Sequence, residues 1–283
     1  MKKILIISAL VLLIIAGLLA GCAEGKLSQQ QLEQMVTDVL TANAAVETCK
    51  FDMDILTDIE IIGGSNAGKV PMTAKGTGIV DSVNKKMQMT LNMTIDIPDK
   101  GKQEIPAMYY FVDGWMYMKM SIPGQGDQWL RMKMPADMWD QKSQLNQQLK
   151  LLGTAENVEY MGTEDVNGTS CHVVQITPSS EALRDMISQV ELPEMGGIDL
   201  TSIDLADLLK VITVKEWIAS DTNLFVKTEQ HMVIEINAED FGAAKDDFQK
   251  IVEDINVNMR LYDYNKSVTI ELPVEALEAT SLQ

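Results

Sequence analysis

The sequence contains only two histidines and three cysteines among 283 residues. No Cys-x-x-Cys pair occurs, so a zinc site is not expected. The motifs Gly-x-Ser-x-Gly and His-Glu-x-x-His are also missing, as is a phosphate-binding loop, which leaves no signature of a hydrolase, a metalloprotease or a nucleotide-binding enzyme. We therefore predict a protein that is not an enzyme and that holds no metal ion or other cofactor.

Basic residues are scarce as well. The chain has 23 Lys and Arg against 41 Asp and Glu, a net charge of −18 at pH 7. A surface of this sign repels phosphate backbones, so we do not expect nucleic acid as a partner.

Long apolar runs are absent except for one at the amino terminus. Lys2 and Lys3 precede an uncharged stretch at residues 4–20, which ends in Leu-Ala-Gly-Cys22. A basic start, an apolar middle and small residues before a cut are typical of a secretory signal. An uncleaved transmembrane anchor is the alternative, because the run could nearly span a bilayer.

The segment before Cys22 resembles the lipobox of bacterial lipoproteins. That resemblance implies a signal peptide at residues 1–21, cleavage before Cys22, and acylation of this cysteine. Two or three acyl chains would anchor the protein stably. Residues 22–27 would be the lipidated cysteine and a short tether, and residues 28–283 a single extracytoplasmic domain. Ala23 follows the cysteine where Asp would favour inner-membrane retention. We therefore expect the outer membrane in a cell with two membranes, and the outer face of the cell membrane otherwise.

Strand patterns dominate the body, after an amphipathic helix at residues 28–46 in which Ser28 is the expected cap. Residues 86–97 alternate strictly between apolar and polar, and residues 51–61 alternate similarly. Asp113-Gly114 and Asn167-Gly168 predict tight hairpins between strands at 109–112 and 115–120, and at 158–166 and 170–177. Further strands are expected at 129–134, 214–219, 224–236 and 255–262. Further helices are expected at 136–152, from 179 or 180 to 190, at 204–211 and at 240–253.

These elements predict an α+β fold: one large, curved, mostly antiparallel sheet with a single apolar face, wrapped over a few helices as a half-open barrel.

Cys49 and Cys171 remain when Cys22 is used by the anchor. Outside the cell they could form a disulfide, and two buried free thiols are the alternative.

Methionine is abundant, with 19 residues. Several recur at every second position, so they share one face of their strands. Unbranched thioether side chains adapt to ligands of variable shape, and this favours a pliable cavity wall. An ordinary core is the alternative reading, and a Cu(I) site with thioether ligands is a weaker one. The residues expected to line the cavity are Met87, Met89, Leu91, Met93, Met116, Met118, Met120, Met132 and Met134.

Three segments of the second half are similar to the LolA/LppX-like lipoprotein superfamily. They are the hairpin at residues 164–178, the stretch Lys215-Glu216-Trp217-Ile218-Ala219 with its following turn and strand, and residues 262–273, which look like the closing strand of that superfamily. The resemblance implies a half-barrel with an apolar cavity between sheet and helices. It also implies that the protein carries a lipid or a lipidated molecule. The alternative function is a non-catalytic envelope sensor or protein-interaction module whose core is filled.

Overall fold

The computed structural model describes residues 27–64, 67–97, 101–122, 126–134, 152–179, 208–241 and 248–281. Its strands form one twelve-stranded sheet in the order β12-β6-β5-β4-β3-β2-β1-β11-β10-β9-β8-β7. The strands are β1 (Thr48–Ile62), β2 (Gly68–Asp81), β3 (Lys86–Ile97), β4 (Gly101–Val112), β5 (Trp115–Ile122), β6 (Gly126–Lys133), β7 (Ala155–Val166), β8 (Thr169–Pro178), β9 (Leu209–Ala219), β10 (Phe225–Asn237), β11 (Lys250–Tyr262) and β12 (Thr280–Ser281).

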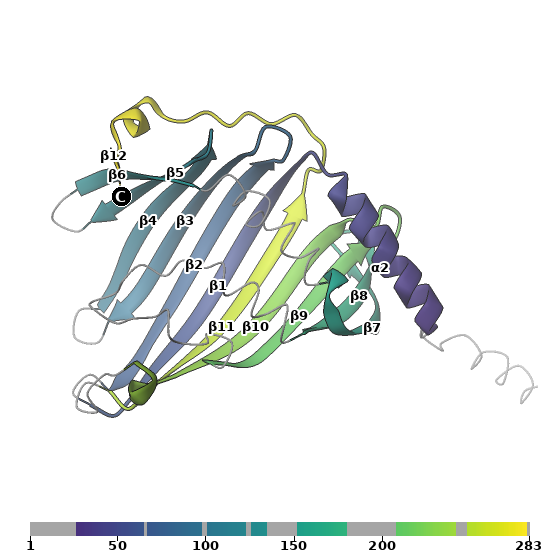
Figure 1. Cartoon of the computed structure of the whole chain (residues 1–283), viewed down its shortest axis with the longest axis horizontal. Coiled ribbons are helices and arrows are strands. Elements are labelled where there is room, and N and C mark those ends of the chain that lie inside the picture. Colours follow the sequence, from purple (N-terminus) through teal and green to yellow (C-terminus); the bar gives the residue numbers. More distant parts are fainter. Residues whose placement is uncertain are drawn as a thin grey trace, which may run out of the picture.

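All neighbouring strands pair antiparallel except β12, which runs parallel to β6. The sheet curves into an open half-barrel whose outermost strands are β7 and β12 (Figure 1). The predicted fold class, a large curved and mostly antiparallel sheet, is therefore confirmed.

The helix α2 (Gln29–Ala44) begins with the capping box that the sequence predicts. The Ser28 hydroxyl accepts a hydrogen bond from the backbone N–H of Gln31, and the Gln31 side chain accepts one from the backbone N–H of Ser28. Leu32, Met35 and Val39 recur at helical spacing and are buried against the sheet. Figure 1 shows α2 beside β8, β9 and β10, at one end of the half-barrel.

The two predicted hairpin turns are confirmed. Asp113 and Gly114 have φ angles of 54° and 76°, and Asn167 and Gly168 have φ angles of 54° and 87°. A two-residue turn with positive φ at both positions matches the right-handed twist of the strands that it joins. The turns thereby fix the registers β4–β5 and β7–β8.

Strand β2 is not predicted by the sequence pattern, because Pro71, Gly76 and Gly78 interrupt it. Gly78 lies directly opposite Phe51 of β1. A Cβ atom at position 78 would lie 2.2 Å from Cζ of the Phe51 ring. The glycine is therefore required for the ring to lie across β2. The first half of β4 was also missed.

Other predictions are corrected by the structure. Residues 209–211, expected in a helix, begin strand β9, and residues 250–253, also expected in a helix, begin β11. Residues 268–273, similar to a closing strand, belong to no strand; a 3-10 helix, η4 (Val274–Glu278), follows them. The signal peptide and Cys22, the helix expected from residue 179 or 180 to 190, and most of the helix at 136–152 lie outside the described residues.

The sheet has apolar clusters on both faces, not on one as predicted. The concave face carries the main core, which includes Phe51, Val174 and Ile218. On the opposite face of β4 and β5, the carboxy-terminal segment covers Tyr110 and Tyr117 with buried and half-buried apolar side chains. A smaller cluster on that face contains Cys171, Val173 and Trp217. The apolar side chains of residues 268–273 therefore cover the outer face of the sheet, and these residues do not add a strand to it.

Candidate functional site

The methionines predicted to line a cavity lie on the concave face. Met87, Met89 and Leu91 of β3 pack against the main core, together with Met116 of β5 and Met132 of β6. Met134 belongs to the buried part of the same cluster. Met93 and Met118 are half-buried and follow the same alternation. Met120 lies in β5, and its side chain lies outside the described residues.

The two ends of the concave face differ in burial. At the end beside α2, the side chains of Val174, Ile176, Val214 and Ile218 are 0% exposed. On β3, β5 and β6, the methionines of the concave face are only half-buried. One end is thus a closed core, whereas the other presents flexible apolar side chains that remain partly accessible.

A buried carboxyl group interrupts the closed end. Glu216 of β9 lies between Val214 and Ile218 in the alternation and is 0% exposed. One carboxyl oxygen, Oε2, accepts a hydrogen bond of 2.6 Å from the Thr228 hydroxyl on β10. The other, Oε1, has no hydrogen-bond partner. Burial raises the pKa of Glu216 to about 8, so the carboxyl is mostly protonated at neutral pH.

Tyr264 and Cys49 belong to the same region. The Tyr264 hydroxyl donates a hydrogen bond of 2.5 Å to the carbonyl oxygen of Phe225. Its pKa is raised well above the usual value by burial, and further by the Cys49 and Glu216 groups. Burial also raises the pKa of the Cys49 thiol to about 11, so this thiol stays protonated and is not a nucleophile at neutral pH.

The disulfide considered for Cys49 and Cys171 is not formed, and both residues are buried free thiols. Cys49 is in β1 and Cys171 in β8, with β11, β10 and β9 between them. They also belong to separate clusters, one on each face of the sheet. A disulfide needs Cα atoms within about 7 Å, whereas neighbouring strands alone are about 4.8 Å apart.

Each histidine lies beside a polar side chain. The Nδ1 atom of His172 lies 3.2 Å from the hydroxyl of Tyr160, and Nε2 of His231 lies 3.1 Å from a carboxylate oxygen of Asp254. Within the described residues, no three His, Cys, Asp or Glu side chains are grouped so that they could hold an ion.

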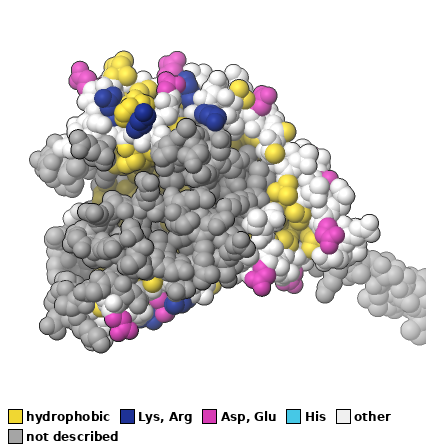
Figure 2. Space-filling view, viewed as in Figure 1, with side chains coloured by type: hydrophobic (Ala, Val, Ile, Leu, Met, Phe, Trp, Pro, Cys, Tyr) yellow, Lys and Arg dark blue, Asp and Glu magenta, His cyan; other side chains and the backbone are white. Residues whose placement is uncertain are grey.

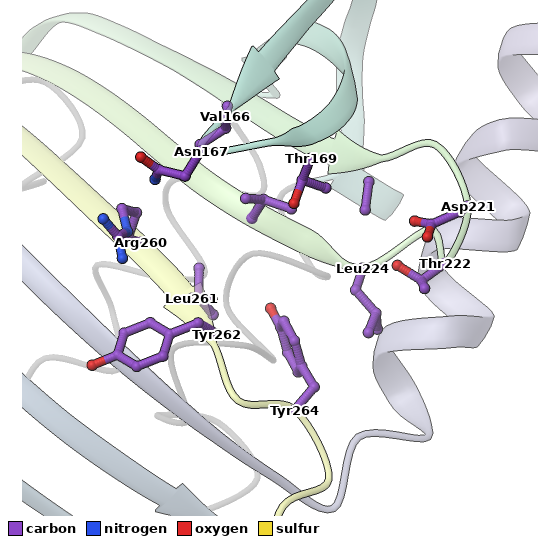
Figure 3. Close-up of a pocket in the computed structure, with 12 residues that line it drawn as sticks. Val166, Asn167, Thr169, Asp221, Thr222, Leu224, Arg260, Leu261, Tyr262 and Tyr264 are labelled. Carbon is purple, nitrogen blue, oxygen red and sulfur yellow. The ribbon is translucent and has the colours of Figure 1, made fainter.

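A separate pocket of about 360 Å³ lies where the β7–β8 hairpin, the β9–β10 turn and the end of β11 meet (Figure 3). Val166, Leu224 and Val226 contribute apolar side chains to its lining. Arg260 and Asp221 place opposite charges on its lining. The sequence analysis did not predict this pocket, since its residues come from five separate strand ends and become neighbours only through the sheet order.

The fold and the concave face define this chain as an open half-barrel with a partly accessible apolar interior. The model of a family of unknown function, DUF6612, matches residues 31–281. The chain therefore belongs to the DUF6612 family. No curated protein matches it.

Solved structures with similar folds include two mycobacterial proteins. One is LprF from Mycobacterium bovis, with 14% identity and a TM-score of 0.42, covering 88% of this chain and 99% of that chain. The other is lipoprotein LppX from Mycobacterium tuberculosis, with 12% identity and a TM-score of 0.41, covering 86% of this chain and 100% of that chain.

Proposed function

We propose that this protein is an extracytoplasmic lipoprotein, anchored through Cys22, that binds a lipid or a lipidated molecule against the concave face of its sheet. The half-buried methionines of β3, β5 and β6 carry this proposal, because they leave apolar surface accessible at one end of the concave face, whereas the end beside α2 is fully buried. Burial of each methylene of an acyl chain contributes about 0.8 kcal/mol. A long chain can therefore bind there without a specific polar contact.

The anchor part of the proposal is supported by the sequence before Cys22 and by the position of α2. Because α2 begins at Gln29, only a short tether separates Cys22 from the folded body. Within the described part of the chain, no helix is long and apolar enough to cross a membrane. The resemblance of residues 164–178 to lipid-carrying lipoproteins agrees with the same role.

Ligand binding is tested with the body from residue 23 onward, produced without the signal and the anchor. Native mass spectrometry and solvent extraction should detect a co-purifying lipid, and a fluorescent fatty acid should bind to delipidated protein. If neither is seen, the concave face is a filled core, and the protein is better described as a sensor or interaction module.

A pair of matched variants places the binding site. Met89→Arg puts a charge on the concave face, whereas Met161→Arg puts it on β7 at a side chain that is 47% exposed. Met89→Arg should weaken fatty-acid binding by about ten-fold or more, because it buries a charge next to the ligand. Met161→Arg should leave binding unchanged. Thermal unfolding of both variants shows whether the fold is retained.

A further inference from the structure

The pocket where the β7–β8 hairpin, the β9–β10 turn and the end of β11 meet is separate from the proposed lipid site. Its described lining residues come from β7 to β11 and the turns that adjoin them, whereas the methionines of the concave face lie on β3, β5 and β6. Its volume of about 360 Å³ lies at the lower end of the range for sites that bind small molecules. The size therefore suits a small ligand.

The apolar part of the lining rests on a buried cluster. Val166 and Val226 are half-buried. They pack against Cys171, Val173 and Trp217, which are each 4% exposed or less. The accessible surface of the two valines leaves water when an apolar group of a ligand contacts it, and this favours binding.

Hydrogen bonds hold the turns around the pocket in place. The backbone N–H of Ser220 donates to the carbonyl oxygen of Ser170 at 2.9 Å and so links the β9–β10 turn to β8. The Tyr264 hydroxyl donates to the carbonyl oxygen of Phe225 at 2.5 Å, which links the segment after β11 to β10. Because the lining is already ordered, a ligand does not have to order it on binding.

Opposite charges stand at the two ends of the pocket. Arg260 and Asn167 lie toward one end of the lining in Figure 3, and Asp221 lies toward the other. The Arg260 side chain is 50% exposed, and its guanidinium lies at the long distance of 4.0 Å from the carboxylate of Asp52. The guanidinium therefore keeps N–H groups that a ligand can use. Such a group binds a carboxylate through two parallel hydrogen bonds.

The end at Asp221 is acidic. Burial raises the pKa of the nearby Cys171 thiol, and the charges of Asp165, Asp221 and Glu164 raise it further. Helix α2, which contacts the β9–β10 turn through Asn43, contains two acidic residues and no basic residue. Figure 2 shows acidic side chains at that side of the molecule. A positively charged group of a ligand is therefore favoured at this end.

We infer that this pocket binds a short peptide with free termini, whose carboxylate pairs with Arg260, whose amino group pairs with Asp221, and whose apolar side chain packs against the valines of the lining. An extended peptide of three residues spans about 10 Å, which gives its two termini separate positions in one small pocket. A purely anionic ligand fits less well, because the chain has a net charge of −18, whereas such a peptide is neutral overall. The inference does not rest on lipid binding at the concave face.

Isothermal titration calorimetry tests the site with the anchor-free body, residues 23–283, and the tripeptide Ala-Leu-Ala. The unaltered body should bind the free peptide. The N-acetylated peptide has lost its positive charge and the C-amidated peptide its negative charge, so each should bind about ten-fold more weakly. Glycerophosphoethanolamine is also a zwitterion but has no apolar side chain, so it should bind more weakly than the free peptide.

Two variants assign the charges of the pocket to the two ends of the peptide. Arg260→Gln should bind the free and the amidated peptide equally weakly, and Asp221→Asn should bind the free and the acetylated peptide equally weakly. The control Lys75→Gln removes one positive charge from β2 at a side chain that is 82% exposed, and it should bind the free peptide like the unaltered body. Thermal unfolding shows whether the variants keep the fold.

The site is refuted if the unaltered body does not bind the free peptide, or if the free, acetylated and amidated peptides bind equally. It is also refuted if both variants still discriminate between these peptides as the unaltered body does. Tighter binding of glycerophosphoethanolamine than of the peptide would overturn the peptide as the occupant and assign the pocket to a zwitterionic headgroup. Fatty-acid binding should be unchanged in Arg260→Gln, so a failure of this site is distinguishable from a failure of the proposed lipid site.

Discussion

Burial of the Glu216 carboxyl group lowers the stability of the folded protein. Taking an ionised carboxylate out of water costs far more than burying a neutral carboxyl group, and one hydrogen bond from Thr228 offsets only part of that cost. The pKa of Glu216 therefore rises from its ordinary value of 4.5 to about 8. In the unfolded chain the carboxyl loses its proton near its ordinary pKa. Between these two values, the folded state binds more protons than the unfolded state.

The free energy of unfolding should consequently fall between about pH 4.5 and pH 8, by about 1.4 kcal/mol per pH unit from this group. Glu216→Gln has no proton to lose, so its stability relative to the unaltered protein should improve as pH rises through that range. Urea unfolding of the anchor-free body at pH 5 and pH 8 measures the difference. Glu159→Gln, at an exposed position on β7, is the control. An equal effect of Glu216→Gln at both pH values would contradict the assignment.

Gly78 is a second residue whose identity is set by one contact. Gly78→Ala places a Cβ atom in the volume of the Phe51 ring, 1 % exposed in the core, so the ring or the strand must move. Overpacking of this kind costs about 1–3 kcal/mol. Thermal unfolding should show the loss, and Phe51→Leu in the same chain should recover part of it. Gly153→Ala meets only ordinary contacts with Leu40 and should change little.

At the scale of elements, Asn43 joins α2 to the β9–β10 turn. Its side-chain amide donates to the carbonyl oxygen of Asn223 at 2.8 Å, and its side-chain oxygen accepts from the N–H of Phe225 at 3.2 Å. Asn43 itself is 1% exposed, so its side-chain amide is shielded from water. These two bonds link the end of α2 to the closed end of the sheet.

Asn43→Ala should destabilise the protein by about 2–4 kcal/mol, since the buried N–H of Phe225 and the half-buried carbonyl of Asn223 lose these partners. Ser28→Ala removes the exposed cap at the other end of α2 and should cost about 1 kcal/mol. Urea unfolding compares the two variants. If the two losses are equal, α2 is held mainly by its apolar face and not by Asn43.

The elements that could be predicted are those whose local pattern agrees with their environment. Strict alternation identified β3, and the pairs Asp113-Gly114 and Asn167-Gly168 identified two turns. Strand β2 was not predicted, because Gly78 is required by the Phe51 ring of the neighbouring strand. The local sequence around Gly78 contains no sign of that contact. Residues 268–273 have strand-like alternation, but their apolar side chains pack onto the outer face of the sheet.

The candidate site was likewise predictable only where a local pattern agrees with the environment of the side chains. The shared face of the methionines could be predicted from spacing alone. The position of Glu216 on the apolar face could also have been predicted, because it alternates with Val214 and Ile218. A charged side chain, however, is normally expected to face solvent. The pocket beside Arg260 could not be predicted, since its residues become neighbours only when the strand order is known.

At the scale of the whole molecule, the half-barrel has a closed end beside α2 and an accessible end at β3–β6. Segments with fewer fully buried apolar contacts open more readily, and amide hydrogen exchange reports such opening. Without ligand, amides of β3, β5 and β6 should therefore exchange faster than those of β8, β9 and β10. A bound fatty acid fills the accessible end and should slow exchange in β3, β5 and β6 only.

Hydrogen exchange followed by mass spectrometry, with and without fatty acid, measures this difference strand by strand. The Met89→Arg variant is the matched control, because it should abolish the added protection while its β8–β10 amides exchange as in the unaltered protein. Slower exchange across all strands would mean that the ligand stabilises the fold globally rather than filling one end. Protection confined to β8–β10 would place the ligand beside Glu216 instead, whose buried Oε1 atom has no hydrogen-bond partner.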